Sequence, residues 1–150
     1  MPGLEDLYRE IILDHYRTPR NRGELESPPA IRTDGHNPLC GDKLKLYLDL
    51  DSDDIIRDVA FEGSGCAISV ASSSLMTEHA KGASIGEIDA LFERVHDMLT
   101  GDDMGDLESL DKLAVLSGVR EYPTRVKCAS LAWHALKNAI AGSGKKVSTE

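Results

Sequence analysis

Residues 43–50 read Lys43-Leu44-Lys45-Leu46-Tyr47-Leu48-Asp49-Leu50, with leucine at every second position. Successive side chains of a β-strand point to opposite faces, so this alternation predicts a strand with one buried face. The run Asp51-Ser52-Asp53-Asp54 predicts a turn, and residues 55–62 predict a second strand that forms a hairpin with the first. Gly63-Ser64-Gly65 then ends the second strand directly before Cys66.

The segment before this hairpin divides into a helix and a loop. Apolar side chains recur at helical spacing in residues 4–17, which predicts an amphipathic helix. Residues 18–35 contain three prolines and two glycines, so we expect an extended loop there.

Helical patterns follow the hairpin. Residues 66–81 predict a helix with small side chains on one side, which suits close packing. Ser84 and Glu87 have the spacing of a capping box, so another helix should begin at Ser84. Residues 101–109 are acidic and predict an excursion from the core.

The last part of the chain predicts two more helices, a short one at residues 110–116 and a final one from Cys128 to Gly142, followed by a frayed tail. The order of helix, strands and helices predicts an α+β fold, in which helices pack on a small antiparallel sheet. Residues 1–150 have the length of one ordinary domain.

Composition limits the functions that this chain can have. Its formal net charge of −9 disfavours binding to nucleic acids and to anionic membranes. No apolar run approaches the roughly 20 residues of a membrane span, and the acidic start differs from a signal peptide. We therefore expect a cytoplasmic protein, in which the three cysteines remain thiols or bind metal.

Three cysteines and an aspartate lie where structured elements are expected to begin. Cys40 and Asp42 flank Gly41 ahead of the first predicted strand, while Cys66 and Cys128 are expected to open helices. A helix N-terminus favours a thiolate, which is both a zinc ligand and a sulfur nucleophile. Alternatively, a cysteine can be a small buried apolar residue. Because the chain has no C-x-x-C pair, the residues by themselves indicate a metal or thiol site and do not decide further.

Four motifs make the chain similar to a known family: Asp14-His15-Tyr16-Arg17-Thr18-Pro19-Arg20-Asn21, Asn37-Pro38-Leu39-Cys40-Gly41-Asp42, Gly63-Ser64-Gly65-Cys66-Ala67-Ile68-Ser69 and Lys127-Cys128-Ala129. They resemble the U-type iron–sulfur assembly proteins, which include the IscU scaffolds, the N-terminal domain of NifU, and SufU. The resemblance covers residues 4–141 and implies an α+β fold with a three-stranded antiparallel sheet.

Two departures from the scaffolds resemble SufU. Lys127 stands where IscU scaffolds carry a histidine, and the segment between Cys66 and Cys128 is longer. Resemblance to SufU implies a zinc-dependent sulfurtransferase that accepts persulfide sulfur from a pyridoxal-phosphate cysteine desulfurase. It implies that Cys40 is the catalytic sulfur acceptor, that sulfur passes on to a downstream iron–sulfur scaffold, and that zinc is bound by Cys40, Asp42, Cys66 and Cys128. The alternative is a scaffold that assembles a [2Fe–2S] cluster on the same thiolates.

Two basic groups of residues fit this interpretation. A zinc ion with three thiolates and one carboxylate leaves a net charge of about −2, by counting deprotonated ligands. Arg125 and Lys127 flank Cys128 and are candidates to offset that charge as neighbours of the ligands. Alternatively they are a solvated basic pair. The arginines at positions 17, 20 and 22 could dock the desulfurase or simply belong to a solvated loop.

Overall fold

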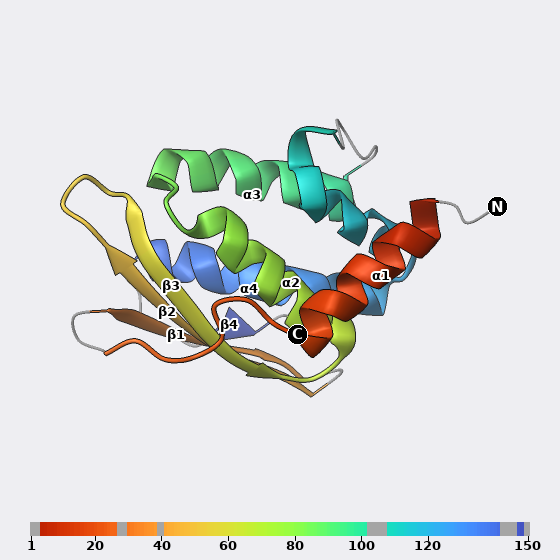
Figure 1. Cartoon of the computed structure of the whole chain (residues 1–150), viewed down its shortest axis with the longest axis horizontal. Helices are drawn as coiled ribbons and strands as arrows, with labels where there is room; N and C mark the ends of the chain where they lie inside the picture. Colours follow the sequence, from red (N-terminus) through yellow and green to blue (C-terminus); the bar gives the residue numbers. More distant parts are fainter. Residues whose placement is uncertain (1–3, 27–29, 39–40, 102–107, 142–146, 149–150) are drawn as a thin grey trace.

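The computed structural model describes residues 4–26, 30–38, 41–101, 108–141 and 147–148. A sheet forms one layer, and helices cover one of its faces (Figure 1). Its strands are β1 (Ile31–Asn37), β2 (Asp42–Leu50), β3 (Ile56–Ser64) and β4 (Val147–Ser148), in the order β3-β2-β1-β4. Strands β1, β2 and β3 pair antiparallel, which confirms the expected three-stranded sheet.

The hairpin expected from the alternating leucines is β2 and β3. Leu44, Leu46 and Leu48 are all buried beneath the helices, while Lys43 and Lys45 are exposed on the opposite face. In the turn between the strands, the carboxylate of Asp51 accepts hydrogen bonds from the backbone N–H groups of Asp53 and Ile55. The period-two pattern and the acidic turn therefore have the structural roles that the sequence predicts.

Strand β1 occupies residues that the sequence assigned to a loop, so the loop prediction was wrong over residues 31–35. The side chains that β1 buries are small or polar: Thr33, Gly35 and Asn37. Because these buried residues are not large and apolar, β1 lacks the apolar alternation on which a strand prediction depends. Gly35 lies close to α4, since a Cβ there would be 3.1 Å from Cδ1 of Leu131.

The helices are α1 (Leu4–Arg17), α2 (Ala67–Ala80), α3 (Ile85–Thr100) and α4 (Pro123–Ile140), together with a 3₁₀-helical segment, η1 (Glu108–Glu121). The predictions for α1 and α2 are confirmed. Both hydrogen bonds of the capping box between Ser84 and Glu87 are present at the start of α3. None of the described helices is long and apolar enough to cross a membrane.

The prediction that Cys128 opens the last helix was wrong. Helix α4 begins at Pro123, which occupies the first turn, where a missing N–H and a fixed φ are tolerated. Cys128 is the sixth residue of α4. The electrostatic effect of a helix end falls off within its first turn, so the helix terminus is not what sets the environment of the Cys128 thiol.

The remaining expectations concern the acidic segment and the tail. Residues 102–107 of the acidic segment lie outside the described residues, and the short helix expected at 110–116 is part of the longer η1. Two tail residues, Val147 and Ser148, pair with β1 in parallel, so the tail is not frayed throughout. Residues 142–146 and 149–150 lie outside the described residues.

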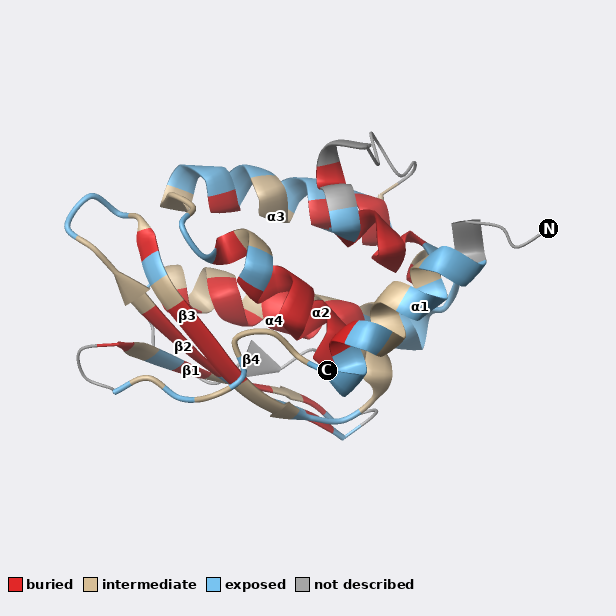
Figure 2. Ribbon diagram, viewed as in Figure 1, coloured by how far each residue is buried: buried red, intermediate tan, exposed pale blue. Residues whose placement is uncertain are grey.

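The core lies between the sheet and the pair α2 and α4, where Figure 2 shows most of the buried residues. Four serines of α2 are buried, and one of them ties the two helices together. The Ser72 hydroxyl donates to the carbonyl of Ala129 at 2.6 Å and accepts from the indole of Trp133 at 3.2 Å. The small side chains expected to permit close packing thus lie at the contact between α2 and α4.

Buried His15 fastens the end of α1 to α2. It is 1% exposed, its Nδ1 lies 2.7 Å from Oγ of Ser74, and its Nε2 lies 3.4 Å from the carboxylate of Glu78. Burial of the imidazole, reinforced by the charge of Arg20 and opposed by Glu78 and Asp14, lowers the pKa of His15 below its ordinary value.

We predict that His15→Gln reduces the loss of stability in mild acid. Because the folded pKa is lowered, the unfolded chain binds more protons than the folded chain below about pH 6.5. The free energy of unfolding therefore falls as the pH drops through this value. Urea denaturation measured at several pH values should give a shallower acid slope for His15→Gln and parallel curves above about pH 7.5. Equal acid slopes would contradict the assignment.

Candidate metal centre

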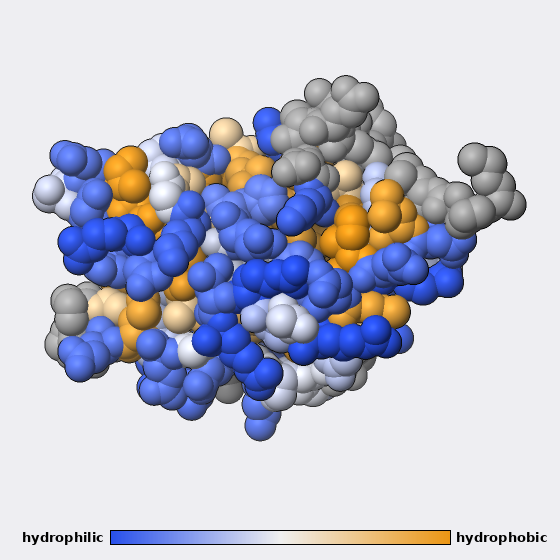
Figure 3. Space-filling model, viewed as in Figure 1, coloured by the Kyte–Doolittle hydropathy of each residue, from blue (hydrophilic) through white to orange (hydrophobic). Residues whose placement is uncertain are grey.

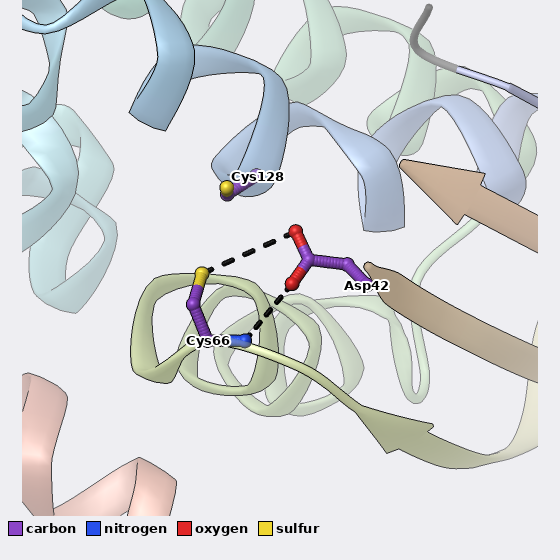
Figure 4. A group of neighbouring side chains, drawn as sticks. All are labelled: Asp42, Cys66 and Cys128. Carbon is purple, nitrogen blue, oxygen red and sulfur yellow. Dashed lines mark hydrogen bonds between the residues drawn. The ribbon is translucent and has the colours of Figure 1, made fainter. Parts of the chain in front are cut away.

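Three of the four side chains singled out in the sequence converge at one end of the sheet (Figure 4). Asp42 is the first residue of β2, Cys66 is the N-cap of α2, and Cys128 lies in the second turn of α4. One ligand atom from each residue lies within 4.8 Å of the other two. Elements that are far apart in the sequence therefore contribute one oxygen and two sulfur atoms to the same place.

Asp42 is the central side chain of this cluster. It is fully buried, and its Oδ1 accepts a hydrogen bond from the backbone N–H of Cys66 at 2.9 Å. Its Oδ2 lies 4.0 Å from the sulfur of Cys66 (Figure 4). The carboxylate thus connects the start of β2 to the start of α2.

Gly65 allows this close approach. A Cβ at position 65 would lie 2.2 Å from Oδ1 and 2.8 Å from Cα of Asp42, and the backbone has φ of +139°. Residues other than glycine rarely adopt that φ. Gly65, which directly follows β3, is therefore required both by its backbone conformation and by the position of the Asp42 carboxylate.

Asn37 is a contact that sequence reasoning did not assign. Its Nδ2 donates to Oδ2 of Asp42 at 3.0 Å and to the sulfur of Cys128 at 3.4 Å. The side chain is fully buried, and its Oδ1 has no hydrogen-bond partner among the described residues. Asn37 opens the motif that ends at Asp42, and this was the available signal of its role.

The thiol of Cys128 is buried between its own helix and Asn37. Its sulfur lies 3.5 Å from the carbonyl oxygen of Thr124, one turn earlier in α4. Cys66, in contrast, is only partly buried. The cluster therefore has a closed side at Cys128 and a more accessible side at Cys66.

The donor atoms fit a zinc ion in kind. Zn–S bonds of about 2.3 Å and Zn–O bonds of about 2.0–2.2 Å place the donors of a tetrahedral site roughly 3.6–3.8 Å apart. The three atoms lie within 4.8 Å of one another, so they would have to move closer together to bind one ion. A buried carboxylate next to two thiols also favours a cation, because burying an uncompensated charge is costly.

The structure describes the two basic candidates, whereas the fourth expected ligand lies outside the described residues. Cys40 lies outside the described residues, in the short connection between β1 and β2. Arg125 and Lys127 are exposed on the first turns of α4, on either side of Val126. Their proposed influence on the cluster remains a prediction.

A groove of about 720 Å³ opens beside Cys66. It is bounded by α1, the start of α2, η1 and the start of α4. Its apolar lining includes Tyr8, Ile12 and Ile68, and its charged residues are Arg9, Glu121 and Arg125. Figure 3 shows apolar side chains gathered between α1 and η1 on the face seen there.

The arginines of the first loop are partly used within the fold. Arg20 pairs with Asp14 at 2.6 Å, and its backbone N–H donates to Ser74. Asn21, with φ of +58°, accepts from the backbone of Phe61 and so attaches this loop to β3. The Asp14–Asn21 motif therefore fastens α1 and the following loop to α2 and to the sheet.

Comparison with known proteins shows the family of this chain. The model of the NifU-like N-terminal domain family matches residues 7–129. The chain belongs to this family. It is 43% identical over 139 residues to a protein of Bacillus subtilis (strain 168) named zinc-dependent sulfurtransferase SufU, covering 93% of this chain and 92% of that protein.

Other relatives carry a different name. The chain is 40% identical to the iron–sulfur cluster assembly scaffold protein IscU of Streptococcus pyogenes serotype M1, covering 93% of this chain and 86% of that protein. The crystal structure of a NifU-like protein (N-terminal) from Brucella abortus aligns with a TM-score of 0.81 and 28% identity, covering 92% of this chain and 94% of that one. Membership of this family agrees with the α+β fold. The names of the relatives give two different functions, sulfur transfer and scaffolding.

We predict that Gly65→Ala displaces Asp42 and destabilises the fold more than Gly23→Ala does. Gly23 has a similar φ of +149°, but a Cβ there would meet nothing within 4 Å. The pair of variants therefore separates backbone strain from the clash. Chemical denaturation should show an additional loss of about 1–3 kcal/mol for Gly65→Ala, the usual cost of overpacking. Equal losses would show that the contact with Asp42 is unimportant.

Proposed function

We propose that this member of the NifU-like family is a zinc-dependent sulfurtransferase in iron–sulfur cluster biogenesis. The observation that carries the proposal is the convergence of Asp42, Cys66 and Cys128 within 4.8 Å, with a donor set suited to zinc. Cys40 is proposed as the fourth ligand and as the sulfur acceptor. The similarity to a protein named zinc-dependent sulfurtransferase supports the proposed activity.

The proposed transfer is a thiol–persulfide exchange. The thiolate of Cys40 attacks the outer sulfur of a persulfide on a cysteine of the partner. A new S–S bond forms at Cys40 while the partner's S–S bond breaks, and the partner's cysteine leaves as a thiolate. Charge and oxidation state balance without any further reactant. Repetition of the same exchange would pass the sulfur to a downstream iron–sulfur scaffold.

Zinc, when bound, would hold its thiolate ligands deprotonated and permit their exchange without redox chemistry. The residues of this chain would divide the remaining tasks. Asp42 is a harder ligand than a thiolate and is anchored by the N–H of Cys66. Cys128 is buried and would remain in place during the transfer. Arg125 and Lys127 would offset the negative charge of the ligands.

The partner that supplies the sulfur is proposed to be a pyridoxal-phosphate cysteine desulfurase. The groove offers this partner a surface close to the cluster in sequence, because Ala67 and Ile68, which directly follow Cys66, line it. Aromatic and arginine side chains such as Tyr122 and Arg125 are frequent at the centre of protein interfaces. Tyr122 is 59% exposed, a large fraction for an aromatic side chain.

A second candidate function is a scaffold for a [2Fe–2S] cluster. It is favoured by the relatives named IscU scaffold proteins at 40% identity, among them one from Thermotoga maritima. The same three side chains are possible cluster ligands, since thiolates are the usual ligands of such clusters. The lysine at position 127, where IscU scaffolds carry a histidine, favours the sulfurtransferase.

We predict that the purified protein holds one zinc ion per chain and that Asp42→Ala weakens its retention. Loss of one of four ligands should lower zinc affinity while the cysteines still anchor the site. Elemental analysis and competition with a chromophoric chelator measure both effects. Anaerobic reconstitution with iron and sulfide provides the comparison. A stable cluster in a chain that holds no zinc would favour the scaffold function instead.

We predict that Cys40 alone carries transferable sulfur. After incubation with a cysteine desulfurase and cysteine, mass spectrometry of peptides should show one added sulfur atom on Cys40. Cys40→Ser should abolish this addition, whereas Ser64→Ala, a change at an exposed residue close to Cys66 in sequence, should leave it intact. Added sulfur on Cys66 or Cys128, with Cys40 unmodified, would contradict the assignment.

A further inference from the structure

We infer that Asn37 is the positioning residue of the metal centre: its amide holds Asp42 and Cys128 in the orientation in which both can bind one ion. The inference rests on the proposed zinc function and assigns a role to a residue that is not itself a proposed ligand. Asn37 contacts two of the three described candidate ligands, and those two belong to β2 and α4.

The backbone places Asn37 for this task. Asn37 is the last residue of β1 and lies directly opposite Asp42 in the β1–β2 register. Both side chains point to the buried face of the sheet, where α4 packs against β1. A side chain at this position can therefore reach across to Asp42 and up to Cys128 at the same time.

The chemistry of the amide suits two neighbours that can each accept a hydrogen bond. A primary amide has two N–H donors on one nitrogen, and Nδ2 of Asn37 faces both Oδ2 of Asp42 and the sulfur of Cys128. Its oxygen, Oδ1, has no partner among the described residues. A buried unpaired oxygen is unfavourable, but the reversed orientation would place that oxygen against a carboxylate and a sulfur.

The position of Asn37 also bears on the loop that contains Cys40. The Asn37–Asp42 pair closes the β1–β2 ladder, so their side-chain hydrogen bond ties the two ends of the connection 38–41. Asn37 therefore fixes one end of the segment that carries the proposed sulfur acceptor. Its loss should loosen the two candidate ligands that it contacts.

The test uses the full chain and two substitutions of similar size. Asn37→Leu removes both donors, and Asn37→Asp keeps the shape while replacing the donor with oxygen. The matched control is Thr33→Val. Thr33 is equally buried, lies on the same face of β1, and has a hydroxyl without a partner among the described residues. The control removes a buried polar atom from the same strand away from the cluster.

Two measurements give the expected result. Zinc affinity, from competition with a chromophoric chelator, should fall about 10–100-fold in both Asn37 variants, as is usual when a residue that orients a ligand is lost. The sulfur-to-metal absorption band of Co²⁺-loaded protein should change, because Cys128 loses its hydrogen bond. Thr33→Val should retain wild-type affinity and the wild-type band.

Thermal unfolding with and without zinc separates positioning from a structural role. A positioning role predicts that zinc raises the melting temperature of the Asn37 variants less than that of the wild type. Equal stabilisation by zinc, together with unchanged affinity and an unchanged cobalt band, would overturn the inference and leave the proposed function intact. A wild-type chain that binds no zinc would instead overturn the proposed metal centre, and the inference with it. Should Asn37→Leu not fold, Asn37→Asp gives the same comparison.

Discussion

The hydrogen bond from the backbone of Cys66 to the carboxylate of Asp42 is the contact on which the candidate site depends. It is 2.9 Å long and joins the first residue of β2 to the N-cap of α2. The bond forms only because Gly65 presents no Cβ to the carboxylate. This hydrogen bond therefore holds together the end of β3, the start of β2 and the start of α2.

The position of the second sulfur depends on helix packing. Cys128 lies in the second turn of α4, and α4 is held against α2 by the hydroxyl of Ser72, which bonds to Ala129 and to Trp133. The small side chains of α2 let the two helices approach closely, so the backbone that carries Cys128 is set by the core. Asn37, at the end of β1, then links this sulfur to Asp42 by donating hydrogen bonds to both.

Much of this fold follows from local patterns in the sequence. The alternating leucines of β2, the capping box of α3 and the periodicity of α1 each reflect the residues' own geometry, and each prediction is confirmed. Strand β1 could not be predicted in this way, since the residues it buries are small or polar and include Gly35, which lies close to Leu131. The start of α4 was misplaced at Cys128, whereas the helix begins at Pro123, because proline can occupy the first turn of a helix.

The site shows the same division between local and tertiary information. The sequence by itself determined which side chains are candidates for the chemistry, since thiols and carboxylates beside glycines are recognisable from residue type and motif. Only the tertiary structure decided that Asp42, Cys66 and Cys128 meet within 4.8 Å and that Asn37 bridges two of them. The physical reason is that these contacts join residues separated by as many as 91 positions in the chain. Their distances are set by how the sheet, α2 and α4 pack, which no local pattern encodes.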